Sequence, residues 1–235
     1  KGWISIFWVS ICGGLLGTYF YTKALGYVNY IDLSVVVLIQ KLQPLFAISL
    51  ASIILREKLS KRFIFLASTA ILGGYLTTFG NKPFLFLDNK SIIASLFALL
   101  ASFCWGSSTV LGKTALKQIP FELVTCIRLI VTGTVALLII ISSGNFSALY
   151  SLSIENYKTI IIIVFTSGSI ALSIYYYGLQ NLAASHTTIY ELVWPLSAVL
   201  LDWLMKGKTL SLTQMIGAII LVSSMTILTE ENSSE

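Results

Sequence analysis

The segment PLFAISLASIILREKLS, from Pro44 to Ser60, has a counterpart in PLSAVLLDWLMKGKTLS, from Pro195 to Ser211. The two align without a gap at the proline, leucine and alanine of the start and at the closing leucine and serine. Upstream, YTKAL (Tyr21 to Leu25) resembles YYYGL (Tyr175 to Leu179). Any two membrane helices share some residues, but a match over three consecutive apolar runs favours a true internal repeat.

The composition indicates that the repeat lies in a membrane. Of the 235 residues, 56% are hydrophobic and 11% are charged, whereas ordinary globular domains carry about 25% charged residues. So few charges cannot cover a surface in contact with water, so most of the surface is expected to face lipid. The net charge of +5 comes from basic residues at the ends of apolar runs, which argues against a nucleic-acid partner. Three cysteines without a CxxC pair indicate neither a disulfide framework nor a zinc site, and no cofactor is expected.

Apolar runs of about 20 residues can cross the hydrocarbon core as helices. The alternating pattern of barrel strands does not occur, so the predicted fold is an all-α integral membrane helical bundle. The eight predicted spans are Trp3 to Thr22, Asp32 to Leu55, Phe63 to Gly80, Ile92 to Gly112, Phe121 to Ser143, Thr159 to Leu179, Thr187 to Met205 and Leu212 to Thr229.

The order of the spans predicts that the repeat is inverted. The proline-containing helices are the second and the seventh, and because an odd number of crossings separates them, the second copy enters the membrane upside down. Inverted repeats are a common architecture of secondary transporters, with the substrate near the midplane. We predict that residues 1–80 are three helices of a first repeat, 81–91 an inter-repeat loop, 92–229 a five-helix second repeat and 230–235 a polar tail. Two N-terminal helices of the first repeat are then expected to be missing.

Orientation follows from the positive charges in the loops. REKLSKR, residues 56–62, holds four cationic residues in seven, so this loop is predicted to be cytoplasmic. Counting crossings places the C-terminus in the cytoplasm as well. The predicted location is the bacterial inner (plasma) membrane.

Several motifs occur in a characteristic order. WGSSTVLGK spans Trp105 to Lys113, PFELVTCIRL ends with Arg128 and Leu129, and Pro44 is followed by a loop containing Glu57. With these motifs the chain resembles the EamA-like branch of the drug/metabolite transporter superfamily. One departure is that Lys208 stands where the second copy would match Glu57.

That resemblance implies a ten-helix fold of two five-helix repeats. It also implies export or exchange of small metabolites, often amino acids or related compounds, without identifying the solute. The expected partners are a small-molecule solute, the lipid bilayer and a second copy in a homodimer.

The polar stretch before Pro44 is the first candidate for a binding site. A lysine in the centre of a span costs about 2.5–3.5 kcal/mol on insertion scales, and Lys41 lies between Gln40 and Gln43. Pro44 lacks an N–H group and its ring clashes with the carbonyl of Gln40, so the helix is expected to bend there. These features predict a polar interior, although Lys41 could also snorkel or form a static pair between helices.

A buried cation requires an anion, and Glu191, four residues before Pro195, is the best-placed carboxylate. Lys41 and Arg128 compete as its partner, and the sequence does not choose between them. Pro44 and Pro195 are the predicted hinges. The predicted substrate-binding residues are Lys41, Gln40, Gln43, Glu191, Arg128, Trp105, Trp194 and Tyr176.

The predicted function is a secondary transporter that moves small amphipathic metabolites by alternating access. A carrier of nucleotide sugars or lipid-linked solutes is the alternative. An intramembrane enzyme is disfavoured, because GxSxG, HExxH and a second histidine do not occur in the sequence. A channel would favour a ring of like residues or a re-entrant filter, and neither is recognisable.

Overall fold

The protein is described here by a computed structural model that covers residues 2–27, 33–79, 89–144, 153–194, 197, 200, 201, 204 and 211–233. Within these residues the chain is helical almost throughout, without strands. The elements in chain order are α1 (Gly2–Trp8), η1 (Val9–Leu16), α2 (Gly17–Leu25), α3 (Leu33–Gln40), α4 (Gln43–Leu50), η2 (Ala51–Leu55), α5 (Lys61–Phe79), α6 (Asn89–Leu116), α7 (Phe121–Ser142), α9 (Ile154–Ile163), η3 (Val164–Ile170), α10 (Ala171–Asn181), α11 (Ala184–Tyr190) and α13 (Leu212–Ser233).

Each predicted span falls on helix in the described residues, with short turns at 41–42 in the second span and at 191–192 in the seventh, which is described continuously as far as Trp194. Among the described residues, four stretches are long and apolar enough to cross a membrane, namely Gly2–Leu25, Ile92–Leu116, Phe121–Ser142 and Ile154–Asn181. The first of these joins α1, a π-helical segment η1 and α2 into one rod. The predicted all-α membrane fold is confirmed.

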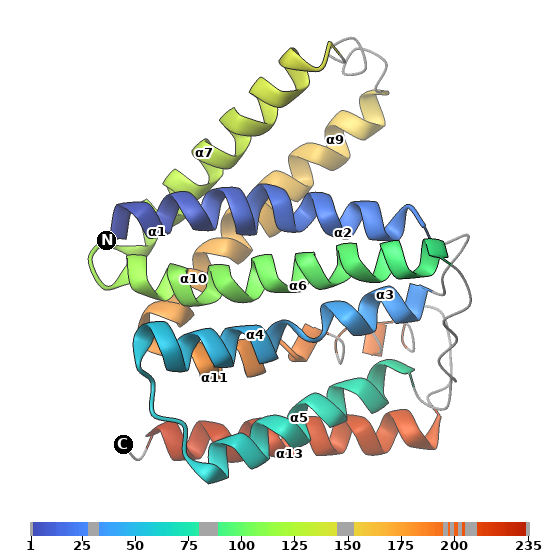
Figure 1. Ribbon diagram of the computed structural model, residues 1–235, viewed down its shortest axis with the longest axis vertical. Coiled ribbons are helices and arrows are strands. Elements are labelled where there is room, and N and C mark those ends of the chain that lie inside the picture. Colours follow the sequence, from blue (N-terminus) through green and yellow to red (C-terminus); the bar gives the residue numbers. More distant parts are fainter. Residues whose placement is uncertain are drawn as a thin grey trace.

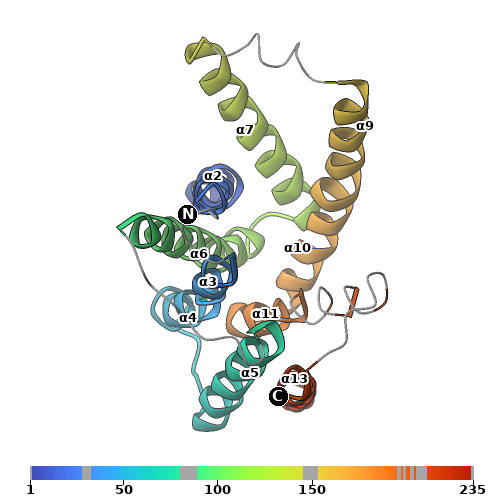
Figure 2. The same ribbon diagram turned by 90° about the vertical axis from the view of Figure 1, so that its right-hand side faces the viewer.

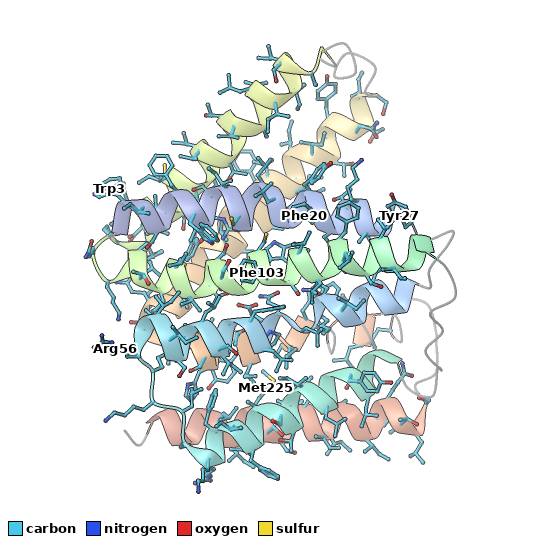
Figure 3. The ribbon with its side chains drawn as sticks, in the orientation of Figure 1. Trp3, Phe20, Tyr27, Arg56, Phe103 and Met225 are labelled. Carbon is cyan, nitrogen blue, oxygen red and sulfur yellow. The ribbon has the colours of Figure 1, made fainter. Side chains whose placement is uncertain are left out.

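Apolar side chains cover the outer faces of the bundle. Ile130 on α7, Ile162 on α9 and Phe165 on η3 are all more than half exposed. Helices α7 and α9 lean away from the rest of the bundle (Figures 1 and 2), and their side chains project outward (Figure 3). Exposed apolar surface on this scale fits contact with lipid.

Helix α6 is the centre of the structure. It lies between the α1–α2 rod on one side and α3 and α4 on the other (Figure 1). Ala94, Ala98 and Ala101 recur at intervals of four and three along α6 and are fully buried. Small side chains at this spacing allow neighbouring helices to approach closely, which is how membrane helices pack.

Helices α5 and α13 form a second close pair, at the far side of the bundle (Figure 1). A Cβ added to Gly73 would lie 2.7 Å from the backbone nitrogen of Leu221, and one added to Gly217 would lie 2.5 Å from that of Thr77. The two backbones therefore touch where both helices lack a side chain.

The two ends of the bundle carry different loops. Arg56 lies at the end that also holds the N-terminus, whereas Tyr27 lies at the opposite end (Figure 3). Arg56 adopts a left-handed conformation with φ of 56°, which ends η2 and turns the chain toward α5. A residue other than glycine costs roughly 1–2 kcal/mol in this conformation, so other contacts must hold the turn.

Candidate functional site

The helix predicted to bend at Pro44 is interrupted just before it. Helix α3 ends at Gln40 and α4 begins at Gln43, with Pro44 in its first turn. In the intervening turn, the N–H of Leu42 donates to the carbonyl of Ile39 at 3.0 Å. The break follows from the proline, because a continuous helix would leave a carbonyl without its donor at that point.

A second break occurs in the later copy of the motif. Helix α11 ends at Tyr190, a turn follows at Glu191 and Leu192, and the helix resumes at Val193. The predicted hinge Pro195 lies outside the described residues, as does Lys208. Within a membrane, backbone that is not helical is tolerated only where it lies against protein or lines a cavity.

A cavity of about 670 Å³ lies where the two breaks meet, within the range of about 300–1,000 Å³ that small-molecule sites occupy. Its walls come from both predicted repeats. Pro44 and seven of the eight predicted binding residues line it, namely Gln40, Lys41, Gln43, Trp105, Arg128, Glu191 and Trp194. Their role in binding a solute stays a prediction.

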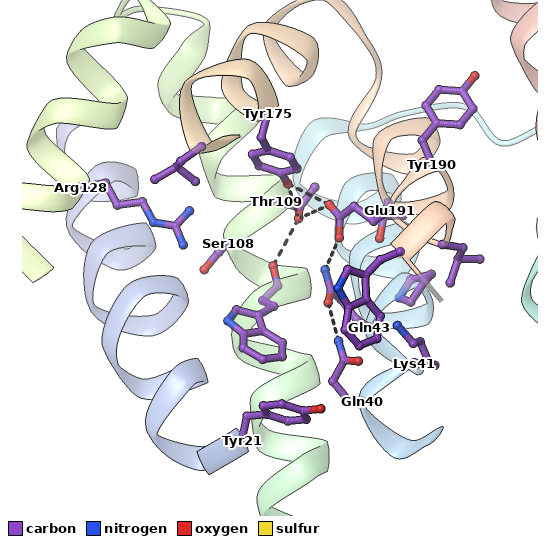
Figure 4. Close-up of a pocket in the computed structure, with 16 residues that line it drawn as sticks. Tyr21, Gln40, Lys41, Gln43, Ser108, Thr109, Arg128, Tyr175, Tyr190 and Glu191 are labelled. Atoms are coloured by element: carbon purple, nitrogen blue, oxygen red, sulfur yellow. Dashed lines mark hydrogen bonds between the residues drawn. The ribbon is translucent and has the colours of Figure 1, made fainter. Parts of the chain in front are cut away.

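Glu191 is the centre of a hydrogen-bond network across the cavity (Figure 4). Its Oε2 accepts from Nε2 of Gln43, and Gln43 in turn accepts from Nε2 of Gln40 at 3.2 Å. Its Oε1 accepts from the Tyr175 hydroxyl at 2.9 Å and from Oγ1 of Thr109 at 3.4 Å. The carboxylate therefore joins the two broken helices through neutral donors.

Lys41 contacts an aromatic ring in place of a carboxylate. Its Nζ lies 4.0 Å from the centroid of the Trp194 ring, close enough for a cation–π interaction. No ion pair between Lys41 and Glu191 occurs in the described structure, although both line the same cavity.

Arg128 is also held by an aromatic residue. Its Nη1 donates to the hydroxyl of Tyr176 at 2.6 Å, and its guanidinium lies 5.7 Å from the centre of that ring. It is not ion-paired with a carboxylate among the described residues. Both cations that competed in the sequence as the partner of Glu191 therefore share its cavity without touching it.

The tyrosine on the cavity wall is Tyr175, one residue before the predicted Tyr176. Tyr176 is fully buried behind Arg128 and is not on the cavity wall, whereas Tyr175 is. Consecutive residues of a helix point about 100° apart, and the rotation of α10 turns Tyr175 toward the cavity and Tyr176 away from it. Thr109 was also missed, and its position four residues after Trp105 could have revealed it, because that spacing shares a helix face.

An aromatic wall closes the side of the cavity toward α2. The rings of Tyr21 and Trp105 have centroids 5.4 Å apart, and both line the cavity. The indole Nε1–H of Trp105 donates to the carbonyl of Gly13 at 3.2 Å. A fixed indole offers a flat surface on which a planar solute could stack.

Glu57 joins the loop of the first predicted repeat to α11. Its Oε1 accepts from the backbone N–H of Ala184 at 2.9 Å, and its Oε2 accepts from the N–H and the hydroxyl of Ser185 at 3.1 and 2.6 Å. These N–H groups have no partner within the helix, so Glu57 acts as an external N-cap.

Lys113 stabilises the helix end just before that cap. Its Nζ donates to the carbonyl oxygens of Leu179 and Gln180 at 3.0 and 2.8 Å. The α10–α11 connection is therefore held at both ends by side chains of opposite charge, Lys113 from α6 and Glu57 from the loop after η2. The sequence motifs contained both residues but indicated neither contact.

A family model for the EamA-like transporter family matches residues 1–79 and 92–229. The chain belongs to the EamA-like transporter family. Its members are membrane transporters, so the chain is a transporter of small molecules and not an enzyme.

Two relatives extend this result. The chain is 39% identical over 219 residues to the riboflavin transporter ImpX of Fusobacterium nucleatum, a match that covers 93% of this chain and 73% of that protein. A protein of known crystal structure superposes with a TM-score of 0.76 at 17% identity, over 97% of this chain and 77% of the other. At that identity the superposition shows the shared fold alone.

Proposed function

We propose that this protein carries a planar heteroaromatic solute of the flavin class across the membrane. The observation that carries the proposal is the cavity between the two broken helices. It combines an aromatic wall with a polar edge built on Glu191, and it is roomy enough for a tricyclic ring.

The aromatic wall suits a flat ring. Tyr21, Trp105 and Trp194 all line the cavity, and indole and phenol rings bind flat solutes by offset stacking. Lys41 lies against Trp194, so the charge stays satisfied when the cavity is empty.

The polar edge suits the imide of a flavin. An imide presents one N–H donor between two carbonyl acceptors. Glu191 would accept from the imide N–H, and the amide of Gln43, which donates to Glu191 in this structure, would donate to one of the flanking carbonyls. Similarity to a riboflavin transporter supports the same class of solute.

Alternating access is the proposed mechanism of transport. The predicted repeats 1–80 and 92–229 would rock about the cavity, with the breaks before Pro44 and Pro195 as hinges. The proposed orientation places the 56–62 loop and the C-terminus in the cytoplasm of a bacterial inner membrane, on the evidence of the basic residues in that loop.

An aromatic amino acid is the second candidate solute. Its support is that Glu191 shares the cavity with Lys41 and Arg128 without an ion pair in the described structure. A zwitterion could bind an ammonium group to the carboxylate and a carboxylate group to a cation.

The test is uptake of labelled riboflavin, and in parallel of labelled tryptophan, by liposomes that contain the purified full chain. We expect saturable riboflavin uptake that falls about 10- to 100-fold in Glu191→Gln, because a hydrogen bond to a charged group is lost. Glu122→Gln is the matched control, since Glu122 is exposed in the first turn of α7. Tryptophan uptake without riboflavin uptake would refute the flavin assignment in favour of the amino acid.

Trp194→Ala tests the stacking surface, with Trp3→Ala as control. The two tryptophans are similarly exposed, at 57% and 58%, but only Trp194 lines the cavity. Uptake should fall in the first variant alone. An equal effect in both would mean that the cavity is not where the solute binds.

A further inference from the structure

We infer that Arg128 binds the oxygen-rich end of the solute, opposite the end bound by Glu191 and Gln43. This inference rests on the proposed function and deepens it, because it names the residue that recognises the solute's side chain. A flavin side chain carries hydroxyl or phosphate oxygens, and the shared chemistry is a group of hydrogen-bond acceptors.

The first argument is the unused donor capacity of Arg128. A guanidinium has five N–H donors and no acceptor. In the described structure its one hydrogen bond goes to the Tyr176 hydroxyl, although the side chain lines the cavity. A cation within a membrane is costly without acceptors, so the cavity face of this guanidinium favours a ligand that supplies them.

The second argument is that Gly13, which has no side chain, leaves room for Arg128 beside η1. A Cβ added to Gly13 would lie 3.4 Å from Nη2 of Arg128 and 2.4 Å from Oγ of Ser108. Because Gly13 has no side chain, the guanidinium and Ser108 can both pack beside η1. Tyr176 fixes the other side of Arg128, so the group is positioned before any solute arrives.

The third argument is the polarity of the cavity. Ser108 and Thr109 are neighbours on α6 and point about 100° apart. Thr109 bonds to Glu191, whereas Ser108 faces the side from which Arg128 enters (Figure 4). Glu191 and the Gln43 amide therefore lie on the side of Thr109 and Arg128 on the side of Ser108, which orients an elongated solute with its imide at Glu191 and its oxygens at Arg128.

The experiment compares solutes with and without the oxygen-rich group. Riboflavin and lumiflavin share the ring system, but lumiflavin has a methyl group in place of the ribityl chain. Tryptophan and tryptamine form the equivalent pair for the second candidate solute, with and without a carboxylate. Competition constants are measured for the wild type, Arg128→Gln, Arg128→Lys and Tyr176→Phe.

In the wild type we expect riboflavin to compete about tenfold or more better than lumiflavin. Arg128→Gln should weaken riboflavin about 10- to 100-fold while lumiflavin changes little, so the preference disappears. Arg128→Lys should recover part of it, since lysine keeps the charge but loses the planar fork. Flavin mononucleotide, which adds a phosphate to the ribityl chain, separates the two kinds of oxygen-rich group. Arg128→Gln should weaken flavin mononucleotide more than riboflavin if the site favours an anionic tail, and by the same factor if it favours a polyol.

One result would overturn the inference: Arg128→Gln could weaken both members of a pair equally, and Arg128 would then be a structural residue. Tyr176→Phe removes the hydroxyl that positions Arg128, so it should reduce the preference by a smaller factor than Arg128→Gln. If the wild type binds tryptophan but no flavin, the flavin proposal fails by itself. The tryptophan–tryptamine preference then decides the role of Arg128 by the same criterion, and a wild type that binds none of the four compounds ends both proposals.

Discussion

Glu57→Gln should destabilise the connection between the two predicted repeats. Glu57 is part-buried and accepts three hydrogen bonds from Ala184 and Ser185 at the start of α11. Glutamine keeps one carbonyl acceptor but turns an NH₂ group toward donors. Hydrogen bonds to charged groups contribute about 1.5–3 kcal/mol each. The loss of one such bond and the weakening of another, discounted for partial exposure, gives about 2–3 kcal/mol.

The assay is thermal unfolding of the purified protein in detergent, with the free energy of unfolding taken from reversible denaturation. For a chain of this size about 1 kcal/mol moves Tm by roughly 2–4 °C, so Glu57→Gln should lower Tm by about 5–10 °C. Ser185→Ala removes one of the three bonds and should cost less. The double variant should cost less than the sum of the two, because both changes remove the same contact.

Glu155→Gln is the matched control for this substitution. Glu155 pairs with Lys158 at 2.8 Å, but its side chain is 77% exposed, and exposed pairs contribute little. Its Tm should stay within about 2 °C of the wild type. Equal Tm values for Glu57→Gln and Glu155→Gln would refute the reasoning, since the three bonds would then contribute no more than a surface pair.

Two further predictions test the helix packing and the cavity network. Gly73→Ala should lower the free energy of unfolding by about 1–3 kcal/mol, because the added methyl would lie 2.7 Å from a backbone nitrogen of α13. Gly133→Ala is the control: nothing lies within 4 Å of its added methyl, so it should be neutral or slightly stabilising. Equal free energies of unfolding in the two variants would contradict the close α5–α13 contact. Tyr175→Phe keeps the ring but removes the hydroxyl that donates to Glu191, so the KM for riboflavin uptake should rise about five- to tenfold. Tyr177, a neighbour that is 59% exposed, provides the control, and Tyr177→Phe should leave KM unchanged. If KM were unchanged in both variants, the hydroxyl of Tyr175 would have no role in binding the solute.

The sequence alone determined the class of fold. A chain with 11% charged residues can bury its backbone hydrogen bonds in lipid only as helices, given that barrel periodicity is absent. Runs of about 20 apolar residues then define each span, and these agree with the described helices. Pro44 also located the first helix break, because a missing N–H group acts locally.

The sequence also supplied half of the residues that line the cavity, but not the contacts between them. Charge and polarity within a span mark a residue as buried against protein, whatever its partner. Lys41, Arg128 and Glu191 could therefore be selected as a group. The sequence offered two ion pairs, whereas the structure places Lys41 on Trp194 and Arg128 on Tyr176.

Only the tertiary structure decided those partners, because they depend on how each helix is rotated about its axis and how deep it sits. A rotation of one residue, about 100°, exchanges Tyr175 for Tyr176 on the cavity wall. The bonds of Glu57 to α11 depend on a turn that begins at Arg56 and on the depth of a helix far away in the sequence. Apolar periodicity sets where helices begin and end, while close packing against neighbours, small residues at the contacts and satisfaction of polar groups set their rotation and depth.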